Sequence, residues 1–270
     1  MIAAACLAPA AALFAAFWLL PMARLAALPA LATGTAGGWS AYAAVLTEPR
    51  YLRSLLQTTG LSLAVTAAAL ALAAGVGLYL GRRRFAGRRL LLSVLSLPLS
   101  FPGVVVAFFV ILIGGRQGPV ASLTESLFGE RITFAYGFIG LFLAYLYFSM
   151  PRAIAAFTAA AETLEPQLEE AARSLGASRR RVLVDVWLPA LAPTAMATGA
   201  MIFATAMGAF GTAFTLASRF EVLPITIYNE FTNYANFATA ASLSLALGVM
   251  TWAVLFIAAR LAARPVAGVA

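Results

Sequence analysis

The chain alternates between long apolar runs and shorter polar stretches. Six runs are each long enough to cross a bilayer as a helix, and the segments between them carry nearly all of the charge. Because a spanning segment must satisfy its own backbone hydrogen bonds, this alternation predicts an all-α polytopic membrane protein with six transmembrane helices. The predicted spans are residues 2–23, 54–80, 90–113, 132–156, 190–217 and 237–259.

The stretches between the runs predict loops and one short extra helix. The polar residues 33–53 are expected to form an external loop, and a short interfacial helix is expected around residues 120–128. Within the third run, Pro98 and Pro102 interrupt the helix, and such a break persists only where protein or water satisfies the freed backbone groups. The first run lacks a basic leader, so a cleaved signal peptide is not expected.

One stretch, residues 160–189, is predicted to lie outside the membrane between the fourth and fifth spans. Its larger part, residues 166–189, is called here the signature segment. A charge at the bilayer centre costs about 2.5–3.5 kcal/mol, so this segment cannot lie in the bilayer core. Its charged residues are Glu169, Glu170, Arg173, Arg179, Arg180, Arg181 and Asp185.

The signature segment predicts two helices joined by a sharp turn. Pro166 suits the first position of a helix, and Gly176 is placed to end that helix in a left-handed turn. Ser178 is expected to cap the second helix. The first helix carries a narrow apolar stripe, which fits either a helix lying on the lipid surface or one docked in a partner's groove. The stripe consists of Leu168, Ala171, Ala172 and Leu175.

The composition limits the function. The chain has 270 residues, of which 63% are hydrophobic, and is expected to form one membrane domain over residues 1–270. The net charge is +8, but the arginines lie at the ends of spans, which indicates no nucleic-acid partner. One cysteine and no histidine argue against a disulfide and a metal site. No phosphate-binding loop is present, so the chain is not expected to be an enzyme.

The distribution of arginine predicts the orientation. Twelve arginines fall on the side that holds both termini and the signature segment, and six fall on the other side. Because arginine accumulates on the cytoplasmic side, both termini and the signature segment are expected in the cytoplasm.

The signature segment resembles the Glu-Ala-Ala signature of ABC importer permeases. The matching positions have the spacing of that signature, with valine at residue 186 where isoleucine is usual: Glu170, Ala171, Ala172, Gly176, Val186, Leu188 and Pro189. The resemblance is to binding-protein-dependent permeases of type I importers, nearest to the polyamine, ferric iron, thiamine and phosphonate group. It identifies the first helix of the segment as a coupling helix, which docks on the ATP-hydrolysing subunit.

The resemblance also implies partners and a place in the cell. It implies ABC ATPase subunits, a second permease subunit that is the same or a homologous chain, and a periplasmic solute-binding protein, all at the bacterial inner membrane. No cofactor is expected in this chain, because ATP and Mg²⁺ would be bound by the ATPase subunit. The docking residues implied are Glu169, Glu170, Ala171, Ala172, Leu175, Gly176, Val186, Leu188 and Pro189.

By the same resemblance, the fifth span lines the solute pathway. Met207, Phe210 and Phe214 are spaced as one helix face and would form an apolar gate, although ordinary helix packing explains them equally well. Tyr228, Glu230 and Asn233 would lie at the external mouth, where a solvated loop is the alternative. The expected solute is a small polar molecule that is polyamine-, phosphonate- or amino-acid-like, and the sequence does not name it.

Two alternatives to the importer permease remain at this point. An ion-coupled carrier usually needs ionisable groups inside its spans, and the cores of the six runs contain no Asp, Glu, Lys or His. A membrane scaffold that does not transport and only recruits a partner through its cytoplasmic helix is the other alternative.

Overall fold

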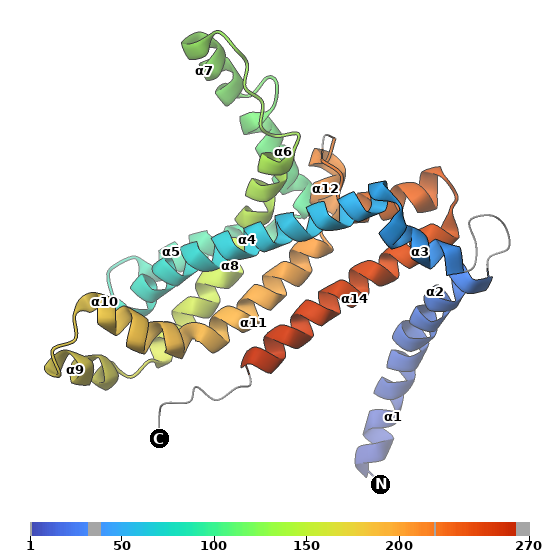
Figure 1. Cartoon of the computed structure of the whole chain (residues 1–270). Coiled ribbons are helices and arrows are strands. Elements are labelled where there is room, and N and C mark those ends of the chain that lie inside the picture. Colours follow the sequence, from blue (N-terminus) through green and yellow to red (C-terminus); the bar gives the residue numbers. More distant parts are fainter. Residues whose placement is uncertain (1, 32–38, 219, 263–270) are drawn as a thin grey trace. The chain divides into compact units, whose positions relative to one another are not determined.

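The protein is predominantly helical over the residues that the computed structural model describes, which are 2–31, 39–218 and 220–262. These residues contain no strand, which confirms the predicted all-α class (Figure 1). Arg219 and Arg264, two of the arginines used to predict the orientation, lie outside the described residues. The α-helices are α1 (Ile2–Phe14), α2 (Leu20–Leu31), α3 (Trp39–Thr47), α4 (Pro49–Arg82), α5 (Arg88–Ser96), α6 (Gly103–Gly114), α7 (Pro119–Phe128), α8 (Phe138–Thr163), α9 (Pro166–Ser174), α10 (Arg179–Val182), α11 (Leu188–Met207), α12 (Phe210–Leu216), α13 (Leu223–Tyr228) and α14 (Phe237–Ala262).

Four short segments of other helical types connect these helices. They are the π-helical turns η1 (Ala15–Leu19), η3 (Leu183–Trp187) and η4 (Asn229–Asn233), and the 3₁₀ turn η2 (Leu97–Ser100). In the described part of the chain, six helical stretches are long and apolar enough to cross a membrane. The protein is therefore a multi-pass membrane protein, as predicted. The six stretches are Leu7–Leu31, Pro49–Arg82, Gly103–Phe128, Phe138–Thr163, Arg179–Met207 and Phe237–Leu261.

The chain divides into two compact units. Unit 1 consists of Met1–Thr58 and Glu221–Met250, and unit 2 consists of Thr59–Phe220 and Thr251–Ala270. The helices α4 and α14 each contribute residues to both units. Within unit 2, α7 lies at one end and α9 and α10 lie at the opposite end (Figure 1).

In unit 2, two glycines bring α4 against α8. A Cβ atom at Gly77 would lie 2.5 Å from Phe157 Cβ and 3.0 Å from the backbone of Phe157. A Cβ atom at Gly81 would lie 2.5 Å from Ala161 Cβ and 2.9 Å from the carbonyl oxygen of Thr158. Small residues four apart allow this close approach, which is the usual means of packing helices in lipid.

The third and fifth predicted spans are both broken in unit 2. The third is divided into α5, η2 and α6 near Pro98 and Pro102, as the prolines predicted. The fifth was predicted as one helix, and this is wrong, because it ends at Met207 and begins again at Phe210. Glycine at position 208 weakens the helix there, and the Tyr145 hydroxyl donates a 2.8 Å hydrogen bond to the carbonyl of Ala209, the residue at which α12 is capped.

The two breaks face each other within unit 2. A Cβ atom at Gly103, the first residue of α6, would lie 2.5 Å from the hydroxyl oxygen of Thr212 in α12. A Cβ atom at Gly211 would lie 3.1 Å from Val104. The start of α6 therefore packs directly on α12, through positions that have no room for a side chain.

Unit 1 has a small core built from distant parts of the sequence. Its buried members are Val45, Leu55, Leu223 and Leu243. Two hydrogen bonds support this core, between the hydroxyls of Ser54 and Thr226 at 2.7 Å, and from the backbone N–H of Leu223 to Thr58 Oγ1 at 2.7 Å.

Other helix limits differ from the sequence prediction. The first helical stretch continues past Pro21 to Leu31, because η1 loosens the hydrogen-bond ladder where proline cannot donate. Of the expected loop 33–53, residues 33–38 lie outside the described residues, and most of the rest forms α3 and the start of α4. The short helix expected around residues 120–128 is confirmed as α7.

The contact between α4 and α8 predicts a sharp difference between neighbouring glycines. Gly77→Ala should destabilise the protein by about 1–3 kcal/mol, because the new methyl group overlaps Phe157. Gly75→Ala is the matched control on the same helix, since a Cβ atom there meets nothing within 4 Å. Thermal unfolding of both variants in detergent measures the difference, and equal midpoints would contradict the packing.

Candidate functional site

The signature segment begins with helix α9, which forms as its sequence predicts. The helix starts at Pro166, where the missing N–H of proline is not needed. Glu169 lies in its first turn and Arg173 in its last, an arrangement that suits the helix dipole.

The turn after α9 is a Schellman motif centred on Gly176. This glycine has a φ of 82°, which is the left-handed conformation predicted for it. The N–H of Ala177 bonds to the carbonyl of Ala172 at 3.0 Å, and the N–H of Gly176 bonds to the carbonyl of Arg173 at 2.9 Å. Ser178 then caps α10 by accepting a 3.3 Å hydrogen bond from the N–H of Arg181, which confirms the predicted cap.

No described part of the chain buries the apolar stripe of α9. Leu168 is 50% exposed and Leu175 is 89% exposed, and the helix has no buried residue. Leu175 is one of the nine residues implied in docking, and of the other eight, four are exposed and four, including Glu169, are half-buried. The exposed residues are Glu170, Ala171, Gly176 and Leu188, and the other half-buried residues are Ala172, Val186 and Pro189.

The carboxylate of Glu169 is instead directed to its own chain. It forms an ion pair with Arg173 on the same helix at 2.7 Å and another with Arg82, the last residue of α4, at 3.9 Å. The guanidinium of Arg82 also lies 5.7 Å from the centre of the Trp187 ring in η3. The contacts of Arg82 and Trp187 could not be predicted from the sequence, because nothing in a linear pattern indicates that α4 ends beside the signature segment.

A second arginine closes the loop between α4 and α5. The Arg88 side chain forms an ion pair with Glu162 near the end of α8, and its Nε donates a 2.7 Å hydrogen bond to the carbonyl of Leu80. The sequence used the arginines of residues 82–89 only to predict the orientation, and two of them, Arg82 and Arg88, have these specific partners.

The residues proposed for the pathway in the fifth span do not share one helix. Met207 is fully buried at the end of α11, whereas Phe210 and Phe214 lie on α12 and are 39% and 58% exposed. The expected spacing on a single helix face is therefore wrong for Met207. The rings of Phe210 and Phe214 are 5.4 Å apart and remain together on the short helix after the break.

The three other residues proposed for the pathway belong to unit 1. Tyr228 is half-buried at the end of α13, and the exposed Asn233 donates a 2.9 Å hydrogen bond to the side-chain oxygen of Asn229. Glu230 is only 3% exposed, so it is not the solvated loop residue that the sequence allowed.

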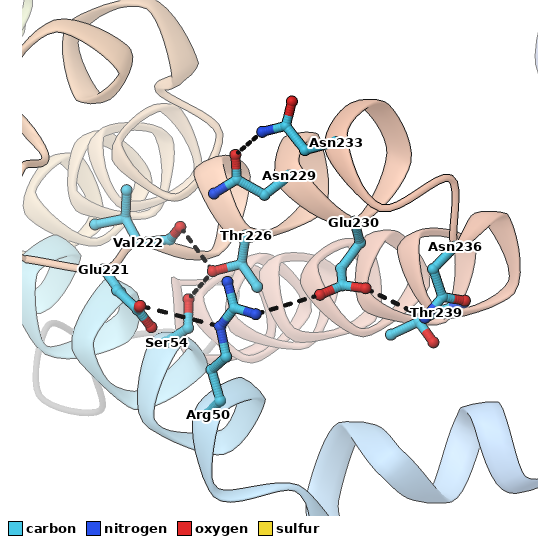
Figure 2. A network of polar contacts seen from close by, with 10 residues as sticks. All are labelled: Arg50, Ser54, Glu221, Val222, Thr226, Asn229, Glu230, Asn233, Asn236 and Thr239. Carbon is cyan, nitrogen blue, oxygen red and sulfur yellow. Dashed lines mark hydrogen bonds and ion pairs between the residues drawn. The ribbon is translucent and has the colours of Figure 1, made fainter. Parts of the chain in front are cut away.

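The buried carboxylate of Glu230 is held by Arg50 and Asn236. Figure 2 shows Arg50 between Glu221 and Glu230, with N···O distances of 4.0 and 3.6 Å. The side-chain amide of Asn236 donates a 3.2 Å hydrogen bond to Glu230. A buried charge needs such partners, because its transfer out of water is otherwise unfavourable.

A pocket of about 360 Å³ in unit 1 lies beside this network. Its lining includes one arginine, one carboxylate and several neutral polar side chains: Ser40, Glu48, Arg50, Tyr51, Asn236 and Thr239. Since Arg50 already faces the carboxylates of Glu221 and Glu230, the pocket has no positive charge in excess, and it does not suit an anion. In the described part of the chain, no group of three His, Cys, Asp or Glu side chains could hold a metal ion.

The helical multi-pass fold and the signature segment together are those of a membrane permease. Residues 73–266 match the family described as binding-protein-dependent transport system inner membrane component, and the chain belongs to that family. This confirms the resemblance found in the sequence.

Three relatives illustrate the family. The chain is 36% identical over 179 residues to the molybdenum transport system permease protein ModB of Escherichia coli (strain K12), which covers 65% of this chain and 75% of the relative. It is 29% identical over 223 residues to ModB of Mycobacterium bovis, an alignment that covers 81% of this chain and 83% of the relative. It is 32% identical to the sulfate transport system permease protein CysW of Synechocystis, an alignment that covers 64% of this chain and 63% of the relative.

Solved structures show the same fold. A bacterial alginate ABC transporter, in complex with an alginate pentasaccharide-bound periplasmic protein, contains a chain that matches 97% of this one with a TM-score of 0.79 and 18% identity. A chain of the MetNI methionine ABC transporter matches 80% with a TM-score of 0.58 and 17% identity. The relatives are permease subunits, which are transporter components and not themselves ATPases, as predicted for this chain.

The network around Glu230 predicts a specific loss of stability. Arg50→Met should destabilise the protein by about 1–3 kcal/mol, because it removes the cation that faces a buried carboxylate. Arg53→Met is the control, since Arg53 is exposed on the same helix. Denaturant unfolding in detergent measures both, and Arg50→Met combined with Glu230→Gln should recover part of the loss. A stability for Arg50→Met equal to that of Arg53→Met would contradict the role of this ion pair.

Proposed function

We propose that the chain is the permease subunit of an ABC importer that carries a tetrahedral oxyanion, molybdate or sulfate, through a pathway of alternating access. In this proposal residues 1–270 form a single permease domain, both termini lie in the cytoplasm, and the protein resides in the bacterial inner membrane. The observation that carries the proposal is the similarity to a molybdenum permease over three quarters of that relative's length.

Several relatives support an oxyanion. Relatives from three bacterial species are named for molybdenum and one from Synechocystis is named for sulfate, at 29–36% identity. Molybdate and sulfate are both tetrahedral dianions, so one kind of pathway suits both. This solute differs from the polyamine-, phosphonate- or amino-acid-like solute expected from the sequence. A thiamine permease is also among the relatives, at 30% identity over 34% of its length.

The charge of the helices around the two breaks agrees with a dianion. The sequences of α6, α11 and α12 contain no acidic residue that would repel it. Phe210 and Phe214, which are exposed on α12, would form the apolar gate of the pathway.

The proposed docking of the ATPase subunit uses the exposed face of α9. Leu168 and Leu175 offer apolar contacts, and Glu170 offers an exposed carboxylate beside them. A groove on the partner that covers this stripe would bury apolar surface that no part of the described chain covers. ATP and Mg²⁺ would be held by that partner, a second permease subunit would complete the pathway, and a periplasmic binding protein would deliver the solute.

Purification of the assembled complex tests the function. The chain is co-expressed with the neighbouring genes and purified through a tag on this chain, and ATP hydrolysis is measured with and without the binding protein. We expect an ATPase to co-purify and to be stimulated by the loaded binding protein. Calorimetric titration of the binding protein with molybdate, sulfate, thiamine and spermidine identifies the solute. Binding of thiamine or spermidine alone would disprove the oxyanion.

Reversal of one charge on α9 tests the docking surface. Glu170→Lys should abolish most of the solute uptake, because it places a cation where the partner meets a carboxylate, while the protein still inserts into the membrane. Glu170→Gln should give a smaller loss, since it keeps the size of the side chain. Uptake of radiolabelled solute into vesicles measures both, with the membrane content of the protein as the reference. Uptake by Glu170→Lys at the normal rate would count against docking at this face.

A further inference from the structure

We propose that Arg82 is a positioning residue that fastens the signature segment to α4 and passes the movement of α9 into the membrane helices. This inference rests on the proposed function, because it assigns a role within an importer driven by an ATPase. No sequence motif includes Arg82, and the inference comes from its contacts in unit 2.

Arg82 contacts both halves of the signature segment. Its guanidinium pairs with Glu169 of α9 at 3.9 Å and lies 5.7 Å from the ring centre of Trp187 in η3. Glu169 precedes the Gly176 turn and Trp187 follows it, so one side chain joins the two arms of the turn. The side chains of Arg82 and Glu169 are each only 20% exposed, so water screens the pair less than it screens a surface ion pair.

The backbone that carries Arg82 is fixed to the body of unit 2. Gly81, the preceding residue, lies so close to α8 that a Cβ atom there would overlap Ala161 and the carbonyl oxygen of Thr158. Arg88 adds a second connection from the same loop to Glu162 at the end of α8. Arg82 therefore connects α9 to a rigid pair of helices and not to a free loop.

The contacts around Arg82 are not fully satisfied. In the described part of the chain, Arg82 Nε and Trp187 Nε1 are buried and have no hydrogen-bond partner. Each such buried donor costs about 1–3 kcal/mol. Acceptors supplied to these two donors by a movement of α9 would recover this free energy.

Loss of Arg82 has a distinctive expected effect. The exposed face of α9, with Leu168, Glu170 and Leu175, does not include Arg82, so the ATPase subunit still docks. The movement of α9 is then no longer passed to α4 and α8. ATP hydrolysis continues while uptake falls, whereas a variant that merely folds poorly loses both together.

The experiment reconstitutes the complete complex into proteoliposomes and supplies solute-loaded binding protein. Solute uptake and ATP hydrolysis are then measured in parallel. We expect Arg82→Gln to lower the ratio of solute transported to ATP hydrolysed by about fivefold or more. Arg173→Gln is the matched control, because Arg173 shares the Glu169 carboxylate but lies on α9 itself. Its ratio should stay near that of the wild type.

Two further variants separate the contacts of Arg82. Arg82→Lys keeps the charge opposite Glu169 but not the flat face toward Trp187, and its ratio should lie between wild type and Arg82→Gln. If the complex with Arg82→Gln does not assemble, Arg82→Lys provides the test in its place. Trp187→Phe keeps an aromatic ring face toward Arg82, so its ratio should lie closer to that of the wild type than the ratio of Arg82→Gln does.

The outcomes distinguish this inference from the proposed function. A wild-type complex without ATPase activity would disprove the proposed function and the inference with it. An active wild-type complex with an unchanged ratio in Arg82→Gln would overturn the inference alone. An equal fall in Arg82→Gln and Arg173→Gln would also overturn it, because the effect would then come from the charge balance of Glu169.

Discussion

The close approach of α4 and α8 is the contact on which the arrangement of unit 2 depends. Gly77 and Gly81 leave no room for a side chain between the two helices, so the distance between them is fixed by backbone and Cβ atoms. The hydrophobic effect does not drive helices together within a membrane, because lipid tails are as apolar as the side chains. The two helices therefore associate through tight van der Waals packing. Arg82 and Arg88 follow directly after this contact and reach α9 and α8 from it.

The sequence predicted the helical class and the local form of the signature segment well. Pro166, Gly176 and Ser178 act through the backbone of their nearest neighbours, and such local effects can be read from a linear pattern. The break near Pro102 was predicted for the same reason. The break at Gly208 was missed, because glycine is common in membrane helices and does not by itself end one.

The burial of Glu230 and the contacts of Arg82 could not be predicted, because both depend on residues far away in the sequence. In the sequence Glu230 has the features of a loop residue, and its partner Arg50 lies about 180 positions earlier in the chain. Glu169 similarly belonged to a motif expected to face a partner protein, and the structure directs its side chain to Arg82. A motif thus predicts which segment matters, while the direction of each side chain depends on the tertiary structure.

The continuity of α8 has a mechanical consequence. This helix runs unbroken from Phe138 to Thr163 in spite of Pro151, and its 26 residues extend about 39 Å at 1.5 Å per residue. The path through α11 and α12, by contrast, is interrupted at Gly208, where no ladder of hydrogen bonds joins the two parts. A displacement at the end of unit 2 that contains α9 is therefore transmitted along the whole length of α8, because this helix is continuous. Along α11 the same displacement ends at Gly208, and any movement of α12 is set instead by its close contact with the start of α6.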